Sequence, residues 1–174
     1  MKFILALLSF SVMFLFQGDA PILWDGVGHL TWDDFRGAPE MDTDAAATTV
    51  SALSYNFQGY IQGNELVYVY DVKAYFFPDK SWVRPGMQDE ELLLHEQLHF
   101  DITAWYASKL RKAFDTITPS ADPEEKVRAV YKQIQGELDS VQLRYDKQTD
   151  YSRNTREQLL WQSRIKAYLN RAYD

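Results

Sequence analysis

The chain has 174 residues, no cysteine and a formal net charge of −7. Without cysteine no disulfide can form, so the stability of the fold is expected to come from the hydrophobic core, to which a bound metal can add. No cluster of lysine and arginine marks a nucleic-acid footprint, and the acidic excess indicates a soluble protein that repels other anions.

The first twenty residues have the layout of a secretory signal peptide. Lys2 carries a positive charge, residues 3–16 form an uncharged and mostly apolar run, and Gly18 and Ala20 place small residues before a cleavage point. The run is shorter than the roughly 20 residues that a membrane-spanning helix needs. We therefore expect residues 1–20 to be removed on export and residues 21–174 to form a single domain.

Residues 21 to about 86 are rich in β-branched, aromatic and turn-forming residues, which favours strands joined by loops. Two runs, residues 48–60 and 66–77, have the clearest strand character. Gly63 and Asn64 lie between the two runs, so the runs are expected to form a β-hairpin with these residues in its turn.

From about residue 89 the apolar pattern becomes helical. Residues at spacings of three and four form one stripe: Leu92, His95, His99, Ile102, Tyr106, Leu110 and Ala113. A second helix is expected to begin at Asp122, with Glu125 completing a capping box, and a third to follow Asn154. Strands followed by helices predict an α+β fold, with an N-terminal antiparallel sheet packed on the first helix and two further helices behind it.

Residues 95–99, His-Glu-Gln-Leu-His, have the spacing of a zinc-binding helix. Residues four apart lie on one helix face, with about 5–6 Å between their Cβ atoms, so His95 and His99 can bind one metal ion. Glu96 lies about 100° from His95 and about 60° from His99 around the helix, so its carboxylate flanks the metal. The motif therefore predicts hydrolysis by a Zn²⁺-activated water, with Glu96 as the general base.

The two histidines can also be interpreted as half-buried core residues, because apolar residues share their stripe. Their ligand spacing and the glutamate between them favour the metal site. Asp101 lies about 200° from His99 around the helix, so it is expected to support the helix rather than bind the metal. His29 lies in a glycine-flanked segment and is expected on the surface. A catalytic zinc ion needs a third protein ligand from elsewhere in the chain.

Four further blocks lie at residues 30–37, 81–83, 92–102 and 145–152, with Gln158 and Trp161 behind the last. In this order they resemble the bacterial secreted proteins grouped as domain of unknown function 922, which are suspected zinc-dependent proteases. The resemblance implies a zincin-like fold, a peptide or protein substrate, and a secreted or periplasmic location. In zinc peptidases of this kind an edge strand binds the substrate as an added strand, and by analogy the run 66–77 is the candidate edge.

In such proteins the last block tends to read Tyr-Asp-x-x-Thr-x-His, and the resemblance implies that this histidine is the third metal ligand. The present chain has Tyr145, Asp146 and Thr149 but carries Tyr151 in place of the histidine. We predict that Tyr151 is the third ligand, bound as a phenolate. Asp146 and Asp150 are the alternatives. The block is expected to form a loop between the second and third helices that folds over the metal.

The sequence therefore predicts a zinc metalloprotease with Glu96 as its base. One alternative is a zincin-like binding protein that is catalytically weak or inactive, which the departure at Tyr151 supports. Another is a structural protein with core histidines. Metal content separates the structural protein from the other two, and a substitution of Glu96 separates those two. We expect no nucleic-acid partner and no membrane span after signal cleavage, and the sequence leaves the oligomeric state open.

Overall fold

A computed structural model of the protein describes residues 8–11, 20–118, 120 and 123–173. The elements follow in the order β1 (Leu8–Ser11), β2 (Ile22–Leu23), the short 3-10 helix η1 (Trp32–Asp34), β3 (Ala47–Thr48), β4 (Ser51–Gln62), β5 (Glu65–Phe76), β6 (Trp82–Val83), α1 (Glu90–Asp115), α2 (Glu124–Thr149) and α3 (Thr155–Tyr173). The predicted α+β class is thus confirmed as antiparallel strands followed by three helices.

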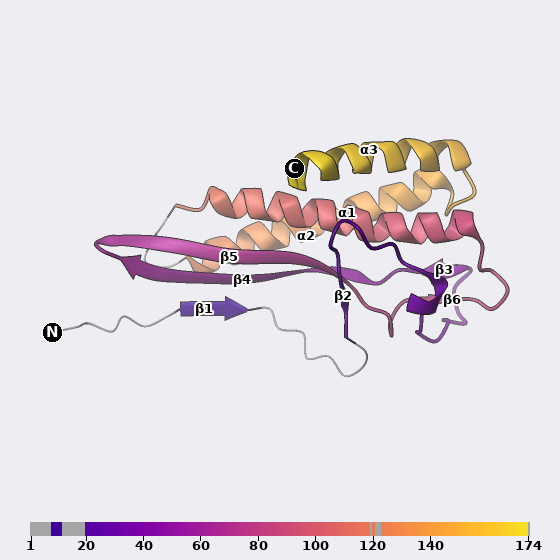
Figure 1. Cartoon of the computed structure of the whole chain (residues 1–174), viewed down its shortest axis with the longest axis horizontal. Coiled ribbons are helices and arrows are strands. Elements are labelled where there is room, and N and C mark those ends of the chain that lie inside the picture. The colour runs from indigo at the N-terminus through magenta and orange to yellow at the C-terminus, as the bar shows by residue number, and fades with distance from the viewer. Residues whose placement is uncertain (1–7, 12–19, 119, 121–122, 174) are drawn as a thin grey trace.

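The hairpin β4–β5 forms the centre of a four-stranded antiparallel sheet with the order β1-β4-β5-β2. Its pairing runs from Ser51 opposite Phe76 to Gln62 opposite Glu65, which confirms the predicted hairpin. Gly63 in its turn has a φ of 65°, a conformation that glycine adopts without the steric penalty of a Cβ. β3 and β6 form a separate two-stranded antiparallel sheet near the start of α1 (Figure 1).

Part of the predicted signal peptide lies in the four-stranded sheet, because β1 pairs with residues 56–59 of β4. Residues 1–7 and 12–19 lie outside the described residues, as does the predicted capping residue Asp122. The N-cap of α2 is Pro123. Signal cleavage after Ala20 stays a prediction. Within the described ranges, no helix is long and apolar enough to cross a membrane.

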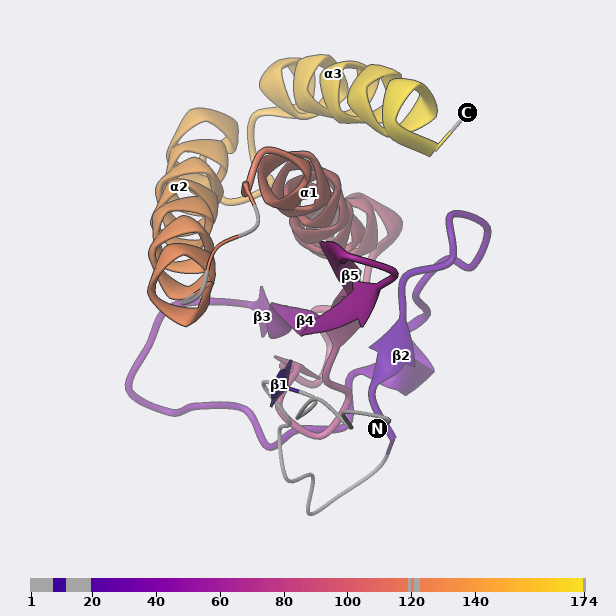
Figure 2. The ribbon, with the colours of Figure 1, turned by 90° about the vertical axis from the view of Figure 1, so that its left-hand side faces the viewer.

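Helix α1 lies between the sheet and the other two helices, as Figure 2 shows. Its buried residues therefore surround most of the helix: Leu92, His95, Glu96, Gln97, Leu98, Phe100, Ile102, Thr103, Ala104, Tyr106, Ala107, Ser108, Leu110 and Phe114. A helix that is buried on several sides loses the single apolar stripe of a surface helix. α2 and α3 each pack on α1, and each buries residues at helical spacing: Val127, Ile134, Leu138, Val141, Tyr145 and Thr149 in α2, and Gln158, Trp161, Ile165 and Leu169 in α3.

The N-terminal segment crosses α1 and is hydrogen-bonded to it. The Trp24 indole nitrogen donates to Asp101 Oδ1 at 2.9 Å, and the Leu30 N–H donates to Gln97 Oε1 at 2.7 Å. Gln97 Nε2 also donates to Asp101, at 3.0 Å. Asp101 therefore has the supporting role expected from its position, and His29 is exposed, as predicted.

Gly37 marks a close approach between two backbone segments. Its N–H donates to the Ser81 carbonyl at 2.8 Å, and a Cβ at this position would lie 2.9 Å from the same oxygen. Because that neighbour is backbone, Gly37→Ala is expected to lower the free energy of unfolding by about 1–3 kcal/mol.

Gly136→Ala is the matched control, because an added Cβ there meets nothing within 4 Å. In the middle of α2 this change is expected to raise the free energy of unfolding by about 0.5–1 kcal/mol. Urea denaturation of both variants measures the two changes in the free energy of unfolding, which are expected to have opposite signs. Wild-type stability in Gly37→Ala would show that the two segments can separate without cost.

Candidate metal and catalytic site

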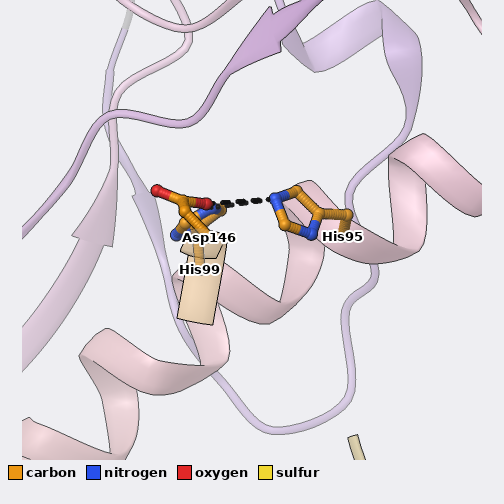
Figure 3. A group of neighbouring side chains, drawn as sticks. All are labelled: His95, His99 and Asp146. Carbon is orange, nitrogen blue, oxygen red and sulfur yellow. Dashed lines mark hydrogen bonds and ion pairs between the residues drawn. The ribbon is translucent and has the colours of Figure 1, made fainter. Parts of the chain in front are cut away.

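Three side chains from two helices point toward one another (Figure 3). His95 and His99 come from α1, and Asp146 comes from the last turns of α2. Asp146 Oδ1 lies 3.2 Å from His95 Nε2 and 2.9 Å from His99 Nε2. The two Nε2 atoms are 3.3 Å apart. His95 is buried and the other two residues are half-buried, so the group is only partly open to solvent.

These separations match a tetrahedral metal ion. Zinc lies about 2.0–2.1 Å from a histidine nitrogen, so two tetrahedral ligand atoms lie about 3.3 Å apart. The three distances in the group, 2.9, 3.2 and 3.3 Å, are close to that value. Two imidazoles and one carboxylate also form the three-ligand set that leaves one position open at a catalytic zinc. The group can therefore bind a metal ion.

The second ring nitrogen of each histidine faces a glutamine. His99 Nδ1 lies 2.7 Å from Gln142 Oε1, and His95 Nδ1 lies 3.1 Å from Gln158 Oε1. Gln142 Nε2 donates to the His99 backbone carbonyl at 2.9 Å, so the amide oxygen is the atom that faces the ring. An amide oxygen only accepts, so His99 Nδ1 carries a proton and Nε2 is directed at the cation position.

Tyr145 packs against both imidazoles. Its ring stacks on His95 with centroids 4.6 Å apart and meets His99 edge-on at 4.9 Å. Its hydroxyl donates to Gln158 Oε1 at 2.7 Å. Burial raises the pKa of this hydroxyl far above its ordinary value, so it remains a neutral donor. Tyr145 is a fully buried core residue, and it also orients the amide that contacts His95.

The charges of the group favour a cation among its three ligand atoms. Burial alone lowers the pKa of His99, but the hydrogen bond to Asp146 and the negative charges of Glu96 and Asp146 raise it above its ordinary value. Burial acts to raise the pKa of Asp146, but the hydrogen bonds to His95 and His99 keep it well below its usual range. A proton on His99 and a metal ion are therefore alternative partners for the same carboxylate.

Glu96 lies beside this group with an unusual environment. It is only 4% exposed, and its Oε2 has no hydrogen-bond partner among the described residues. Burying a carboxylate oxygen without a hydrogen-bond partner lowers the stability of the fold. Packing alone therefore does not explain why a glutamate occupies this position. The Thr49 hydroxyl donates to the Glu96 backbone carbonyl at 3.1 Å, which helps to fix its place.

The group opens into a pocket of about 590 Å³ that Glu96 also lines. Residues 43–49, which include β3, form one wall, and Tyr151 and Arg153 form part of another. β3 therefore lies beside the pocket, whereas the analogy predicted β5. The outer edge of β5 is partly covered by β2 and by Arg111, whose guanidinium donates to the Val72 carbonyl at 2.8 Å.

The three candidates for the third ligand occupy different places. Asp146 lies with the two histidines. Asp150 is exposed, and Arg153 donates to its two carboxylate oxygens at 3.0 and 2.9 Å. Tyr151 lines the pocket but is 61% exposed. The geometry thus favours Asp146, one of the two alternatives, over the predicted ligand Tyr151.

The end of α2 explains this placement. The block 145–152 was expected to form a loop, but α2 continues to Thr149 and carries Asp146 on its last turns. Asp150, Tyr151 and Ser152 then have φ angles of 48°, 54° and 76°, a run of left-handed residues that turns the chain toward α3. The Tyr151 N–H caps the C-terminal end of α2 by donating to the Asp146 carbonyl at 2.9 Å.

Sequence reasoning assigned no role in the site to Gln142 or Gln158, although Gln158 was named with the last family block. Gln142 precedes Tyr145 by three positions on α2, and Gln158 precedes Trp161 by three positions on α3. A polar residue on the apolar face of a helix was the available signal, because a buried amide must find a hydrogen-bond partner.

Comparison with known families bears on the same region. Residues 86–153 match the model of a family described as bacterial protein of unknown function (DUF922). The match supports that family. The matched segment contains α1 and α2, and with them His95, Glu96, His99 and Asp146. No curated protein and no solved structure matches the chain.

Metal titration of two variants distinguishes Asp146 from Tyr151 as the third ligand. Asp146→Ala removes one of three converging donors, so Co²⁺ or Zn²⁺ affinity is expected to fall by more than the roughly 10–100-fold typical of losing a supporting residue. Tyr151→Phe is expected to bind as tightly as the wild type. The reverse result, metal lost in Tyr151→Phe and retained in Asp146→Ala, would restore Tyr151 as the ligand.

Gln142 is expected to support metal binding without touching the metal. Gln142→Ala removes the acceptor of the His99 Nδ1 proton, so metal affinity should fall about 10–100-fold. The matched control is Gln135→Ala, because Gln135 lies on the same helix and donates to the exposed Asp139. Competition with a chelator of known affinity measures both. An equal loss in the two variants would indicate a general effect on α2.

Proposed function

We propose that the protein is an exported zinc metallopeptidase with a zincin-like site. In this proposal His95, His99 and Asp146 hold Zn²⁺, and Glu96 is the general base. The observation that supports it most directly is the unpartnered Oε2 of Glu96 in the same pocket as three converging ligand atoms. A histidine core or a purely structural metal site has no use for such a carboxylate.

The chain's own residues suffice for the proton transfers. Bound zinc would lower the pKa of a water molecule and polarise the carbonyl of the substrate. Glu96 accepts a proton from the attacking water while the water oxygen bonds to the carbonyl carbon. The same carboxyl group then gives that proton to the amide nitrogen as the C–N bond breaks, so the products are a carboxylic acid and an amine.

The wall of the pocket suits an extended peptide. The Ala46 carbonyl accepts from the Arg84 N–H at 2.8 Å, so the peptide groups of residue 46 face β6. Successive residues of an antiparallel strand alternate in direction, so the N–H and C=O of Ala47 point to the other edge. Among the described strands β3 pairs with β6 alone. That free edge can add a peptide strand through main-chain hydrogen bonds.

The expectation for Glu96→Gln follows from its separate role as base. The variant should keep its zinc content, because Glu96 is not a ligand in this proposal. It should cleave a quenched fluorescent peptide or labelled casein at least about 10²-fold more slowly than the wild type, the typical effect of losing a general base. Glu91→Gln, an exposed change on the first turn of the same helix, is the control and should retain full activity.

Two results would contradict the proposal in different ways. An unchanged rate in Glu96→Gln would remove Glu96 from the mechanism. Zinc binding without cleavage of any peptide across a broad library would instead favour the alternative, a zincin-like binding protein without turnover.

A further inference from the structure

Arg84 is hydrogen-bonded to the pocket wall that is formed by residues 43–49 and includes β3. Its backbone N–H donates to the Ala46 carbonyl at 2.8 Å. Its guanidinium Nη2 donates to the carbonyls of Glu40, at 3.3 Å, and of Thr43. Residues 35–46 contain no helix or strand, so these bonds to Arg84 determine where the chain enters the wall.

The other end of the wall has different attachments. The Thr49 hydroxyl donates to the Glu96 carbonyl at 3.1 Å, and the Val50 N–H donates to Ser81 Oγ at 2.9 Å. The end near residue 49 is therefore held by α1 and by the residue before β6. Between the two ends, Ala47 pairs with Val83 of β6. The residues before it are attached through Arg84, which is bonded to the carbonyls of Thr43 and Ala46.

We propose that Arg84 is a positioning residue for substrate binding, which holds residues 43–47 so that the free edge of β3 is ready to pair with an extended peptide. The inference rests on the proposed function. Arg84 is not among the residues that line the pocket, so it acts through the wall and not on the substrate. A wall that is ordered beforehand loses less conformational freedom when the peptide binds. Loss of Arg84 should therefore weaken peptide binding and leave the metal site and the chemical step intact.

The test compares Arg84→Met with Arg128→Met in the zinc-loaded protein. Arg128 is exposed and pairs with Glu124 at the opposite end of α2 from Asp146, so it controls for the loss of an arginine charge far from the pocket. For a quenched fluorescent peptide, Arg84→Met is expected to raise KM about tenfold with kcat and zinc affinity unchanged. Arg128→Met is expected to match the wild type in all three.

A pair of inhibitors provides a measurement that needs no turnover. Acetohydroxamate reaches the metal alone, whereas a peptidyl hydroxamate also extends along the wall. Arg84→Met should weaken the peptidyl compound about tenfold and leave acetohydroxamate unchanged. In the metal-free protein, the backbone amides of residues 43–47 should exchange hydrogen faster than in the wild type, while those of α1 should not.

The outcomes separate this inference from the proposed function. Equal affinity of wild type and Arg84→Met for the peptidyl hydroxamate would overturn the role of Arg84 alone. Loss of zinc or of kcat in Arg84→Met would also overturn it, because Arg84 would then support the whole site. A wild type that binds no zinc would overturn the proposed function itself. If Arg84→Met does not fold, Arg84→Lys keeps the charge but loses the planar fork, and a smaller rise in KM is expected.

Discussion

Helix α1 carries polar side chains into the middle of the domain, and each buried polar group there needs a partner. Gln97 finds its partners in the N-terminal segment and in its own helix, His99 finds one in α2, and His95 finds one in α3. Meeting this constraint fixes how three separate parts of the chain pack on α1. Within the described chain three buried side-chain atoms have no such partner: Arg84 Nε, Glu96 Oε2 and Gln158 Nε2. Of these three, only Glu96 belongs to a residue that lines the pocket beside the three ligand atoms, which is why the proposed function gives it the role of base.

The same packing determines the charge of the site. Asp146 reaches the histidines because α2 lies along α1, and a half-buried carboxylate is tolerated there only beside a positive charge. The supporting groups, Gln142 and Gln158, are neutral amides, so they orient the imidazoles without adding negative charge. Two helices packed in this way thus create a position for a cation, which a proton on His99 or a metal ion can fill.

The sequence predicted the parts of the molecule that depend on local patterns. The β4–β5 hairpin follows from two runs of β-branched and aromatic residues with Gly63 and Asn64 between them. The helices and the shared face of His95 and His99 follow from the spacing of three and four residues. It did not predict Asp146 as the preferred ligand, because the end of a helix depends on the chain that follows it, here three left-handed residues. Local patterns also did not predict the burial of α1 on several sides or the position of β3 beside the pocket, because both depend on contacts between segments that are distant in the sequence.

The residues of the site lie partly inside and partly outside the segment that matches the family model. The matched segment, residues 86–153, contains the cation-binding group and Glu96, whereas β3 and Arg84 precede it and Gln158 follows it. The cation-binding group depends on side chains at fixed helical positions, so few substitutions can preserve it. Residues 45–47 in the wall at β3 are all alanine, so changes of side chain there can alter the shape of the pocket without moving a ligand atom. In the proposed peptidase, the selection of peptides can therefore change while the cation-binding group stays the same.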